Sequence, residues 1–391
     1  MSAAVIAGET ASVLPLLLQP LALRGLELRN RIVVSPMATY SAEDGIPSDF
    51  HLVHLGRFAL GGAGLVMTEA TAVTEQGKIT PGCLGLWQDD QIGPFRRLTD
   101  FLHAQGAAAG IQLGHSGAKG ASQRPWHGYG PLGETDRAAR GEVPWPLVAA
   151  TDEAFETGYQ TPAALDEAGM EALVAAYCAA AQRAEAAGFD VIELHCAHGY
   201  LLHGFLSPLG NKRDDKYGGS LENRMRFPLR LAQALRQAWP DDRPMFVRVS
   251  AIDGVDYGWG LADTVAFDKA LKGIGIDLVD CSTGGMRVPR EYGLPARAPG
   301  FQVPFADGVR AQAGIATMAV GLIRDPAQAE AILKEGAADL IALGREMLFD
   351  PNWAAKATVA LAGETGWSAW PQAFGWWLQR RARLDRPKSG A

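Results

Sequence analysis

The chain has 391 residues, of which 48% are hydrophobic and 20% charged, and its formal net charge at pH 7 is −7. This composition predicts a soluble globular protein and argues against disorder. No dense Lys/Arg run is present, so the sequence offers no electrostatic footprint for nucleic acid or an anionic membrane, and we expect a small-molecule partner.

The first twenty residues show no targeting signal. They lack a cationic n-region, and the apolar run from Val13 to Leu18 is interrupted by Pro15. Neither a signal peptide nor a membrane span is supported, so we interpret residues 1–20 as an N-terminal extension of a cytoplasmic protein.

The cysteines are scattered along the chain, without the regular spacing of a disulfide framework and without a C-x-x-C motif. This argues against a disulfide framework, a zinc site or an iron–sulfur cluster, and we expect buried free thiols. The four residues are Cys83, Cys178, Cys196 and Cys281.

Eight short runs recur along the chain, each almost continuously apolar, as expected of strands covered on both faces. They are residues 30–34, 64–69, 108–113, 191–195, 245–250, 278–281, 316–320 and 340–343.

Helical patterns lie between these runs. The longest covers residues 166–187 and stops before Gly188, a residue suited to the end of a helix. Ser220 is expected to cap another helix, which continues through Arg236 with a kink at Pro228. The other predicted helices are residues 50–60, 93–105, 263–273, 326–336 and 352–361.

Eight strand–helix units without a linker-like break predict a single (β/α)8 TIM barrel, residues 1–391 forming one domain, in preference to a doubly wound sheet. Residues 114–165 are rich in Gly, Pro and Trp and show no convincing helix until late, so we predict a long loop over the barrel mouth. The tail, residues 364–391, carries four tryptophans and is expected to pack across the mouth or into another subunit.

In such a barrel, residues at the carboxyl ends of the strands face the active site. His195, His198 and Tyr200 follow the fourth strand, while Gln112 and Arg248 belong to the third and fifth. Two donors from one turn favour a site for an oxygen that acquires negative charge. A metal-dependent barrel hydrolase is the alternative, but no third ligand with suitable spacing is visible, so we expect no metal.

Glycines follow the last two strands. Gly321, Gly344 and the adjacent Arg345 suit a phosphate held by backbone N–H groups and a guanidinium, although simple glycine turns would give the same pattern. A dinucleotide-binding fingerprint is not expected, because the G-x-G-x-x-G at residues 128–133 has no strand before it and no apolar helix after it.

Several motifs together resemble the Old Yellow Enzyme family of FMN-dependent ene-reductases, most closely its thermophilic-like or xenobiotic-reductase branch. The similarity extends over about residues 20–380. The motifs are SPMATYSAEDG (35–45), GLVMTEATAV (64–73), IQLGHSG (111–117), the whole stretch 191–227, VRVS (247–250) and ADLIALGREMLFDP (338–351).

This resemblance implies non-covalent FMN at the barrel mouth. Gln112 would bind the pyrimidine edge of the flavin, and Arg248 would lie near its N1/O2 end as a fixed positive charge. Gly321, Gly344 and Arg345 would hold the phosphate. The residues expected to line the isoalloxazine ring are Ser35, Pro36, Met37, Ala38 and Ala70.

The resemblance also implies an NAD(P)H:flavin oxidoreductase acting on enones or nitroalkenes. His195 and His198 would donate hydrogen bonds to the substrate oxygen, Tyr200 would give a proton to the α-carbon, and Tyr40 would contact the substrate. NAD(P)H and the alkene would use the same pocket in turn, without a separate dinucleotide domain.

Two positions depart from the branch pattern. Ala38 stands where the branch usually has Cys, so we expect flavin binding and turnover to survive with a shifted potential; an FMN-binding barrel with impaired turnover is the alternative. Trp376 stands where the branch often inserts Arg or Trp from a neighbouring subunit. This predicts an aromatic lid in trans within a homodimer or homotetramer, against the alternative that Trp376 packs in its own chain.

Overall fold

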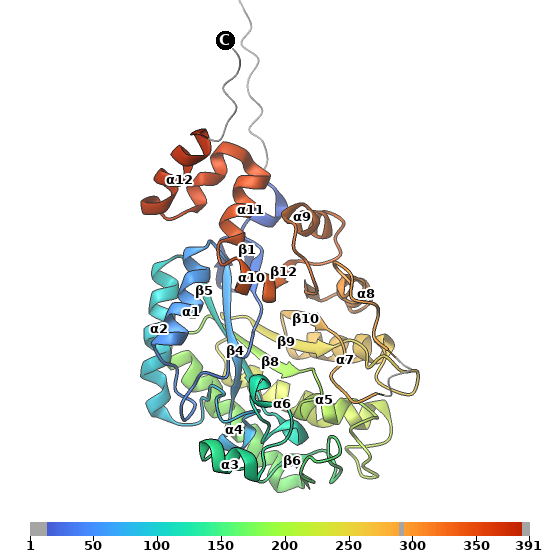
Figure 1. The fold of residues 1–391 in the computed structure, drawn as a ribbon. Helices are drawn as coiled ribbons and strands as arrows, with labels where there is room; N and C mark the ends of the chain where they lie inside the picture. Colours follow the sequence, from blue (N-terminus) through green and yellow to red (C-terminus); the bar gives the residue numbers. More distant parts are fainter. Residues whose placement is uncertain (1–13, 289–292, 385–391) are drawn as a thin grey trace, which may run out of the picture.

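The computed structural model describes residues 14–288 and 293–384, so residues 1–13 of the predicted extension and 385–391 of the predicted tail lie outside it. Eight parallel strands form a closed barrel, which confirms the predicted fold (Figure 1). The strands are β3 (Ile32–Val34), β4 (Leu65–Ala72), β5 (Ala108–Gly114), β8 (Val191–Cys196), β9 (Met245–Ser250), β10 (Leu278–Ser282), β11 (Ala316–Ala319) and β12 (Leu340–Leu343).

Helices cover the outside of the barrel. Asp166 and Ser220 cap two of them, Ser220 as predicted, accepting the backbone N–H groups of Gly169 and Asn223 at 2.7 and 3.3 Å. The sequence pattern assigns no range to α8, whose buried face consists of small residues and one valine. The covering helices are α1 (Asp49–Leu60), α2 (Ile92–Ala104), α4 (Glu167–Ala186), α6 (Leu221–Ala238), α7 (Leu261–Ile274), α8 (Val303–Ala313), α9 (Pro326–Lys334) and α11 (Trp353–Ala362).

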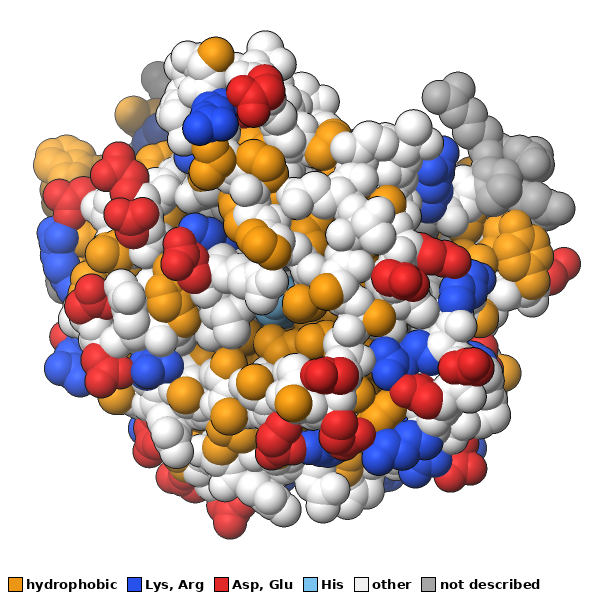
Figure 2. Space-filling view, turned by 90° about the horizontal axis from the view of Figure 1, so that it is seen from below, with side chains coloured by type: hydrophobic (Ala, Val, Ile, Leu, Met, Phe, Trp, Pro, Cys, Tyr) orange, Lys and Arg blue, Asp and Glu red, His pale blue; other side chains and the backbone are white. Residues whose placement is uncertain are grey.

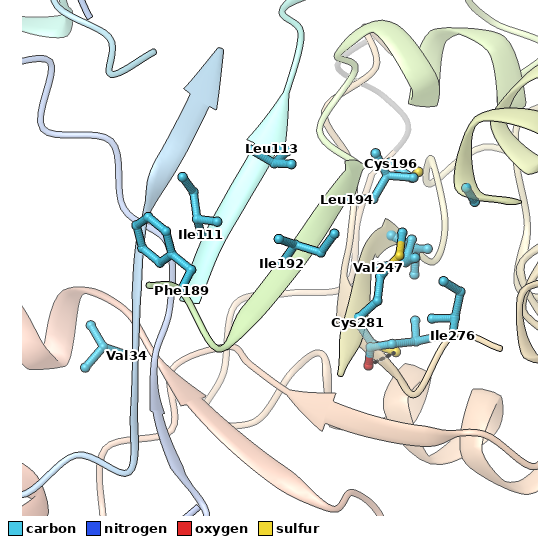
Figure 3. Packing of buried hydrophobic residues seen from close by; sticks show 14 of the residues in the cluster. Val34, Ile111, Leu113, Phe189, Ile192, Leu194, Cys196, Val247, Ile276 and Cys281 are labelled. Carbon is cyan, nitrogen blue, oxygen red and sulfur yellow. Dashed lines mark hydrogen bonds between the residues drawn. The ribbon is translucent and has the colours of Figure 1, made fainter. Parts of the chain in front are cut away.

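The alternation of side chains along each strand separates two environments. Outward residues such as Ile111, Ile192 and Val247 belong to the large apolar layer beneath the helices (Figure 3). Inward residues near the strand starts, including Val191 and Phe246, form a second apolar cluster inside the barrel.

This inner cluster closes the base of the barrel. The hairpin of β1 (Leu21–Leu23) and β2 (Leu26–Leu28) packs Leu21, Leu23, Leu26 and Leu28 with it. One step further along the strands the interior becomes polar. The polar residues there are Gln112, Glu193, Arg248 and Asp280, all buried.

The segment between β5 and β8 is less irregular than predicted. It contains α3 (Glu134–Arg140), so the expectation of no early helix in residues 114–165 is wrong there. Local polar contacts stabilise α3: the Asp136 carboxylate accepts the N–H of Gly133 at 2.9 Å and pairs with Arg140. Because Asp136 is its one buried residue, α3 has no apolar periodicity. The other short elements are η1 (Leu16–Leu18), η2 (Glu75–Gly77), η3 (Asp89–Gln91), η4 (Gly117–Lys119), η5 (Pro125–His127), β6 (Val148–Ala149) and β7 (Ala163–Ala164).

The described tail forms η6 (Gly363–Ala369) and α12 (Gln372–Leu384), and α12 packs mainly against η6. In Figure 1, α12 lies beside α11 at the end of the molecule opposite α3 and β6. Within one chain, therefore, the tail does not cross the mouth. Among the described residues no helix is long and apolar enough to span a membrane.

Candidate active site

The turn after β8 presents both histidines at the mouth. His198 and Gly199 have left-handed backbones, with φ of 61° and 73°, so the chain reverses before α5 (Leu201–Leu206) begins. The His198 N–H donates to Ser250 Oγ at 3.0 Å, and the Gly199 N–H donates to His203 Nδ1 at 2.8 Å. A Cβ on Gly285 would overlap the His198 backbone, so this close approach requires glycine.

The two imidazoles are neutral and face each other. The Ala197 N–H donates to His195 Nδ1 at 3.2 Å, which leaves the proton of His195 on Nε2, 3.4 Å from His198 Nδ1. His198 Nε2 lies 2.8 Å from Ser282 Oγ. Burial and the charge of Arg248 lower the pKa of both histidines well below their ordinary value. Each ring therefore offers one N–H at neutral pH.

Tyr200 stands next to this pair, its ring centroid 5.1 Å from that of His195. Burial raises the pKa of Tyr200 well above its ordinary value, so the phenol keeps its proton. Lys119 lies 5.2 Å over the Tyr200 ring and donates to the carbonyl oxygens of His198 and Gly285 at 2.8 and 3.2 Å. Burial lowers the pKa of Lys119 to about 8. No sequence pattern marks Lys119, which ties together two loops distant in the chain.

Beneath the histidines lies a buried charge cluster. Arg248 Nε is 3.1 Å from Asp280 Oδ2, and Arg248 Nη1 donates to Ser35 Oγ at 3.4 Å. Gln112 Nε2 donates to Glu193 Oε1 at 2.8 Å. Burial, reinforced by the charge of Asp280, raises the pKa of Glu193 to about 8. Burial also raises the pKa of Asp280, while Arg248 opposes that rise. Asp280 is thus the counterion of Arg248, and Glu193 carries a proton at neutral pH.

The predicted phosphate residues share one cavity of about 620 Å³. Gly321, with φ of 120°, and Gly344 line it next to Arg345, which begins α10 (Arg345–Phe349). Arg297 and Arg324 line the same cavity, so three guanidinium groups surround it. Arg324 was not predicted as a phosphate ligand, although it follows Gly321 by only three residues and could have been found from that spacing.

The residues predicted to line the ring system connect this cavity with the histidine turn. Ser35 follows β3 and donates its N–H to Leu343 at 3.0 Å, while Met37 Sδ would lie 3.7 Å from a Cβ on Gly344. Pro36 and Ala38 belong to the same segment. Ala70 is paired in register with Gln112. Ala70 also lines a narrow pocket with His195 and Tyr200.

Seen from the face that is lowest in Figure 1, the molecule has a hollow lined largely by hydrophobic side chains, with histidine on its floor (Figure 2). Tyr40 belongs to the segment after β3, has φ of 51°, and its ring lies 6.3 Å from that of Trp126. Trp376 is not brought to this site in its own chain. It lies on α12, 47% exposed, with the Arg380 guanidinium 3.6 Å above its ring. Across residues 14–288 and 293–384, no group of three His, Cys, Asp or Glu could hold a metal ion.

Comparisons with known proteins agree on one family. The model of the NADH:flavin oxidoreductase / NADH oxidase family matches residues 16–364. An NADPH dehydrogenase of Listeria innocua serovar 6a is 45% identical over 345 residues, covering 88% of this chain and 94% of that protein. The NADPH dehydrogenase of Bacillus subtilis (strain 168) is 43% identical over 350 residues, covering 89% and 96%. Among solved structures, morphinone reductase superposes with a TM-score of 0.72 at 25% identity, covering 93% of this chain and 97% of its own.

Proposed function

The chain belongs to the NADH:flavin oxidoreductase / NADH oxidase family, an oxidoreductase family with FMN as cofactor and NAD(P)H as reductant, and from this we propose that it is an ene-reductase. It reduces activated C=C bonds in α,β-unsaturated carbonyl or nitro compounds. The observation that carries the proposal is the pair of neutral imidazoles facing each other at 3.4 Å beside Tyr200.

The residues present fit FMN. A cavity of about 620 Å³ lined by Gly321, Arg324, Gly344 and Arg345 suits a phosphate and its ribityl chain. Gln112, whose Nε2 donates to Glu193, keeps its carbonyl oxygen available for the N–H of a pyrimidine edge. Arg248 makes one long hydrogen bond, to Ser35, which leaves further N–H groups for a ligand. FMN bound there supplies hydride transfer between NAD(P)H and the alkene.

His195 and His198 bind the substrate oxygen. As the β-carbon takes up hydride, negative charge moves onto this oxygen, and two preorganised N–H donors stabilise it more strongly than the ground state. Ser282 sets the tautomer of His198: when its hydroxyl donates to Nε2, at 2.8 Å, the proton of His198 is on Nδ1 and faces His195.

Tyr200 supplies the proton for the α-carbon, since its raised pKa keeps the phenol protonated throughout the physiological range. Tyr40 contacts the substrate from the segment after β3. Lys119, by donating to the His198 carbonyl, holds the turn that carries these groups.

A second copy of the chain completes the mouth. Phe374, Trp376 and Trp377 on α12 are 47, 47 and 66% exposed, and such aromatics are typical of interfaces. A groove between α1 and α10, lined by Phe50, Val53 and Leu348 and reaching Thr39, offers a complementary apolar surface. We propose that the tail of a neighbouring subunit docks there in a homodimer or homotetramer. Light scattering on protein ending at residue 363 tests this by giving the number of subunits. A truncated protein with as many subunits as the full chain would contradict the proposal.

Anaerobic stopped-flow spectroscopy tests the activity. NADPH is expected to bleach the flavin absorption, and cyclohexenone to restore it. His195→Ala and His198→Ala should each slow reoxidation by about 10²-fold, as for removal of one oxyanion donor. Reduction that cyclohexenone, a maleimide and a nitroalkene all fail to reverse would instead favour a barrel that binds FMN with impaired turnover, and colourless protein would favour the hydrolase.

A further inference from the structure

Glu69 is a buried carboxylate outside the machinery described so far. It lies in β4 where the pairing with β5 shifts register between Met67 and Ala70. Its carboxylate reaches the segment after β3 and accepts the N–H of Thr39 at 2.8 Å, the hydroxyl of Thr39 at 2.6 Å and the N–H of Tyr40 at 3.4 Å. Glu69 is 4% exposed, so these protein donors take the place of water.

The His51 imidazole lies close to this carboxylate, beyond hydrogen-bond distance. The Ser48 N–H donates to His51 Nδ1 at 3.0 Å, which leaves the proton of His51 on Nε2, 3.6 Å from Glu69 Oε1. Burial lowers the pKa of His51 to about 4, so the ring is neutral. A carboxyl group surrounded by donors satisfies all of them when it is ionised, because the anion accepts at both oxygens and the acid must donate.

The segment that Glu69 holds is strained. Tyr40 has φ of 51°, in the left-handed region that side-chain-bearing residues rarely adopt. Arg124 donates to the Tyr40 carbonyl at 3.1 Å from the other side. The Tyr40 backbone is therefore held between a carboxylate on its N–H and a guanidinium on its oxygen.

We propose that Glu69 is a positioning residue for substrate binding: its ionised carboxylate fixes the Thr39–Tyr40 turn in the conformation that places Tyr40 at the mouth, and its protonation releases that turn. This rests on the proposed function insofar as Tyr40 contacts the substrate.

The surroundings of Glu69 make its hold on the Thr39–Tyr40 turn depend on pH. Burial raises the pKa of Glu69 to about 7, against the hydrogen bonds from Thr39 and Tyr40. The titratable groups that face it do not change charge near pH 7. The pKa of Cys83 is raised by burial to about 11, that of Tyr40 is raised by burial, and that of His51 is about 4. Arg124, the charged group on the other side of the turn, is paired with Glu142.

Hydrogen exchange measured by mass spectrometry on peptides covering residues 37–41 tests the turn directly. After correction for the intrinsic pH dependence, protection in the wild-type holoenzyme is expected to be about tenfold lower at pH 6 than at pH 8, as for one charge-assisted hydrogen bond. Glu69→Gln should show the low value at both pH values, and Thr39→Val an intermediate one. Glu27→Gln, which changes an exposed carboxyl in β2, is the matched control.

Kinetics give the second readout. The KM for cyclohexenone should rise about tenfold in Glu69→Gln with little change in kcat, and should vary less between pH 6 and 8 than in the wild type. Protection and KM that are the same in Glu69→Gln and wild type would overturn the proposal, as would wild-type protection independent of pH. If the wild type reduces neither cyclohexenone nor a maleimide nor a nitroalkene, the proposed function fails, while the exchange data still decide whether Glu69 holds the turn.

Discussion

Asp280 Oδ2 lies 3.1 Å from Nε of Arg248 inside the barrel, so the guanidinium expected beside the flavin already has a counterion. Both side chains are at least nine-tenths buried. The sequence-based expectation of a fixed positive charge at this place therefore needs amendment. The group that Arg248 would present to the cofactor is the positive end of an ion pair, whose field is weaker than that of an isolated guanidinium.

Replacing Asp280 by Asn should raise the midpoint potential of bound FMN. Because the charge of Asp280 helps to keep Glu193 protonated, the variant is made together with Glu193→Gln, so that Glu193 cannot ionise in place of Asp280. The unpaired charge of Arg248 would then stabilise the electron-rich reduced flavin, by about 30 mV or more, equivalent to about 1.4 kcal/mol for two electrons. Potentiometric titration measures this. Asp268→Asn is the matched control, because Asp268 is equally buried but faces Cys196 and Cys281 outside the barrel. An unchanged or lower potential in Asp280→Asn would contradict the interpretation.

Glu193→Gln should stabilise the protein at alkaline pH. The folded-state pKa of Glu193 is raised from 4.5 to about 8, so the stability contributed by its proton is complete below pH 4.5 and is lost as pH rises through 8. The glutamine side chain of the variant does not titrate in this range. At pH 9 the free energy of unfolding should therefore favour the variant by a few kcal/mol, at about 1.4 kcal/mol per pKa unit, and the difference should shrink towards pH 5. Urea denaturation at both pH values checks this; a constant difference would refute it.

Asp253→Asn should weaken the support of the histidine turn. Asp253 accepts the Ser207 hydroxyl at 2.6 Å and the Trp259 N–H at 2.8 Å, and lies 3.2 Å from His203 Nε2. Although burial opposes ionisation, these contacts hold the pKa of Asp253 below its ordinary value. His203 in turn accepts the Gly199 N–H. We expect a loss of about 2 kcal/mol of unfolding free energy and a lower kcat. Ser207→Ala, which removes one neutral partner, should cost about 1 kcal/mol; equal losses would argue against a special role for the carboxylate.

Ala38→Cys should raise the FMN potential while leaving flavin binding and turnover intact. A thiol is a weak hydrogen-bond donor, and a donor beside the flavin favours the electron-rich reduced form. A change on the order of 30 mV corresponds to a tenfold change in relative affinity for the two oxidation states. Potentiometric titration of both proteins side by side tests this. Identical potentials would show that position 38 does not tune the cofactor.

The strands could be predicted closely because parallel barrel strands are buried on both faces and read as continuous apolar runs. The predictions for β9 and β12 match residue for residue, and the others differ by at most three residues at an end. Helices without an apolar stripe were harder to predict from the sequence. Polar contacts hold α3 and small residues pack α8, and neither leaves a 3.6-residue period in the sequence.

The residues of the candidate site also fall into a predictable and an unpredictable group. Residues at strand ends, such as His195, Arg248 and Arg345, could be placed from the barrel rule alone. Glu69, Glu193 and Asp280 could not, because their importance comes from distances between strands far apart in sequence. Trp376 stays a prediction, since its proposed place depends on a second chain.

The sealed base of the barrel has a kinetic consequence. Leu21, Leu23 and Leu26 of the hairpin pack into the apolar end. Under the proposed function, reductant and alkene would therefore both use the opening at the other end, and each would exclude the other while it occupies that opening. Initial rates should therefore pass through a maximum as NADPH is raised at a fixed low concentration of enone, and the maximum should move to higher NADPH as the enone concentration increases.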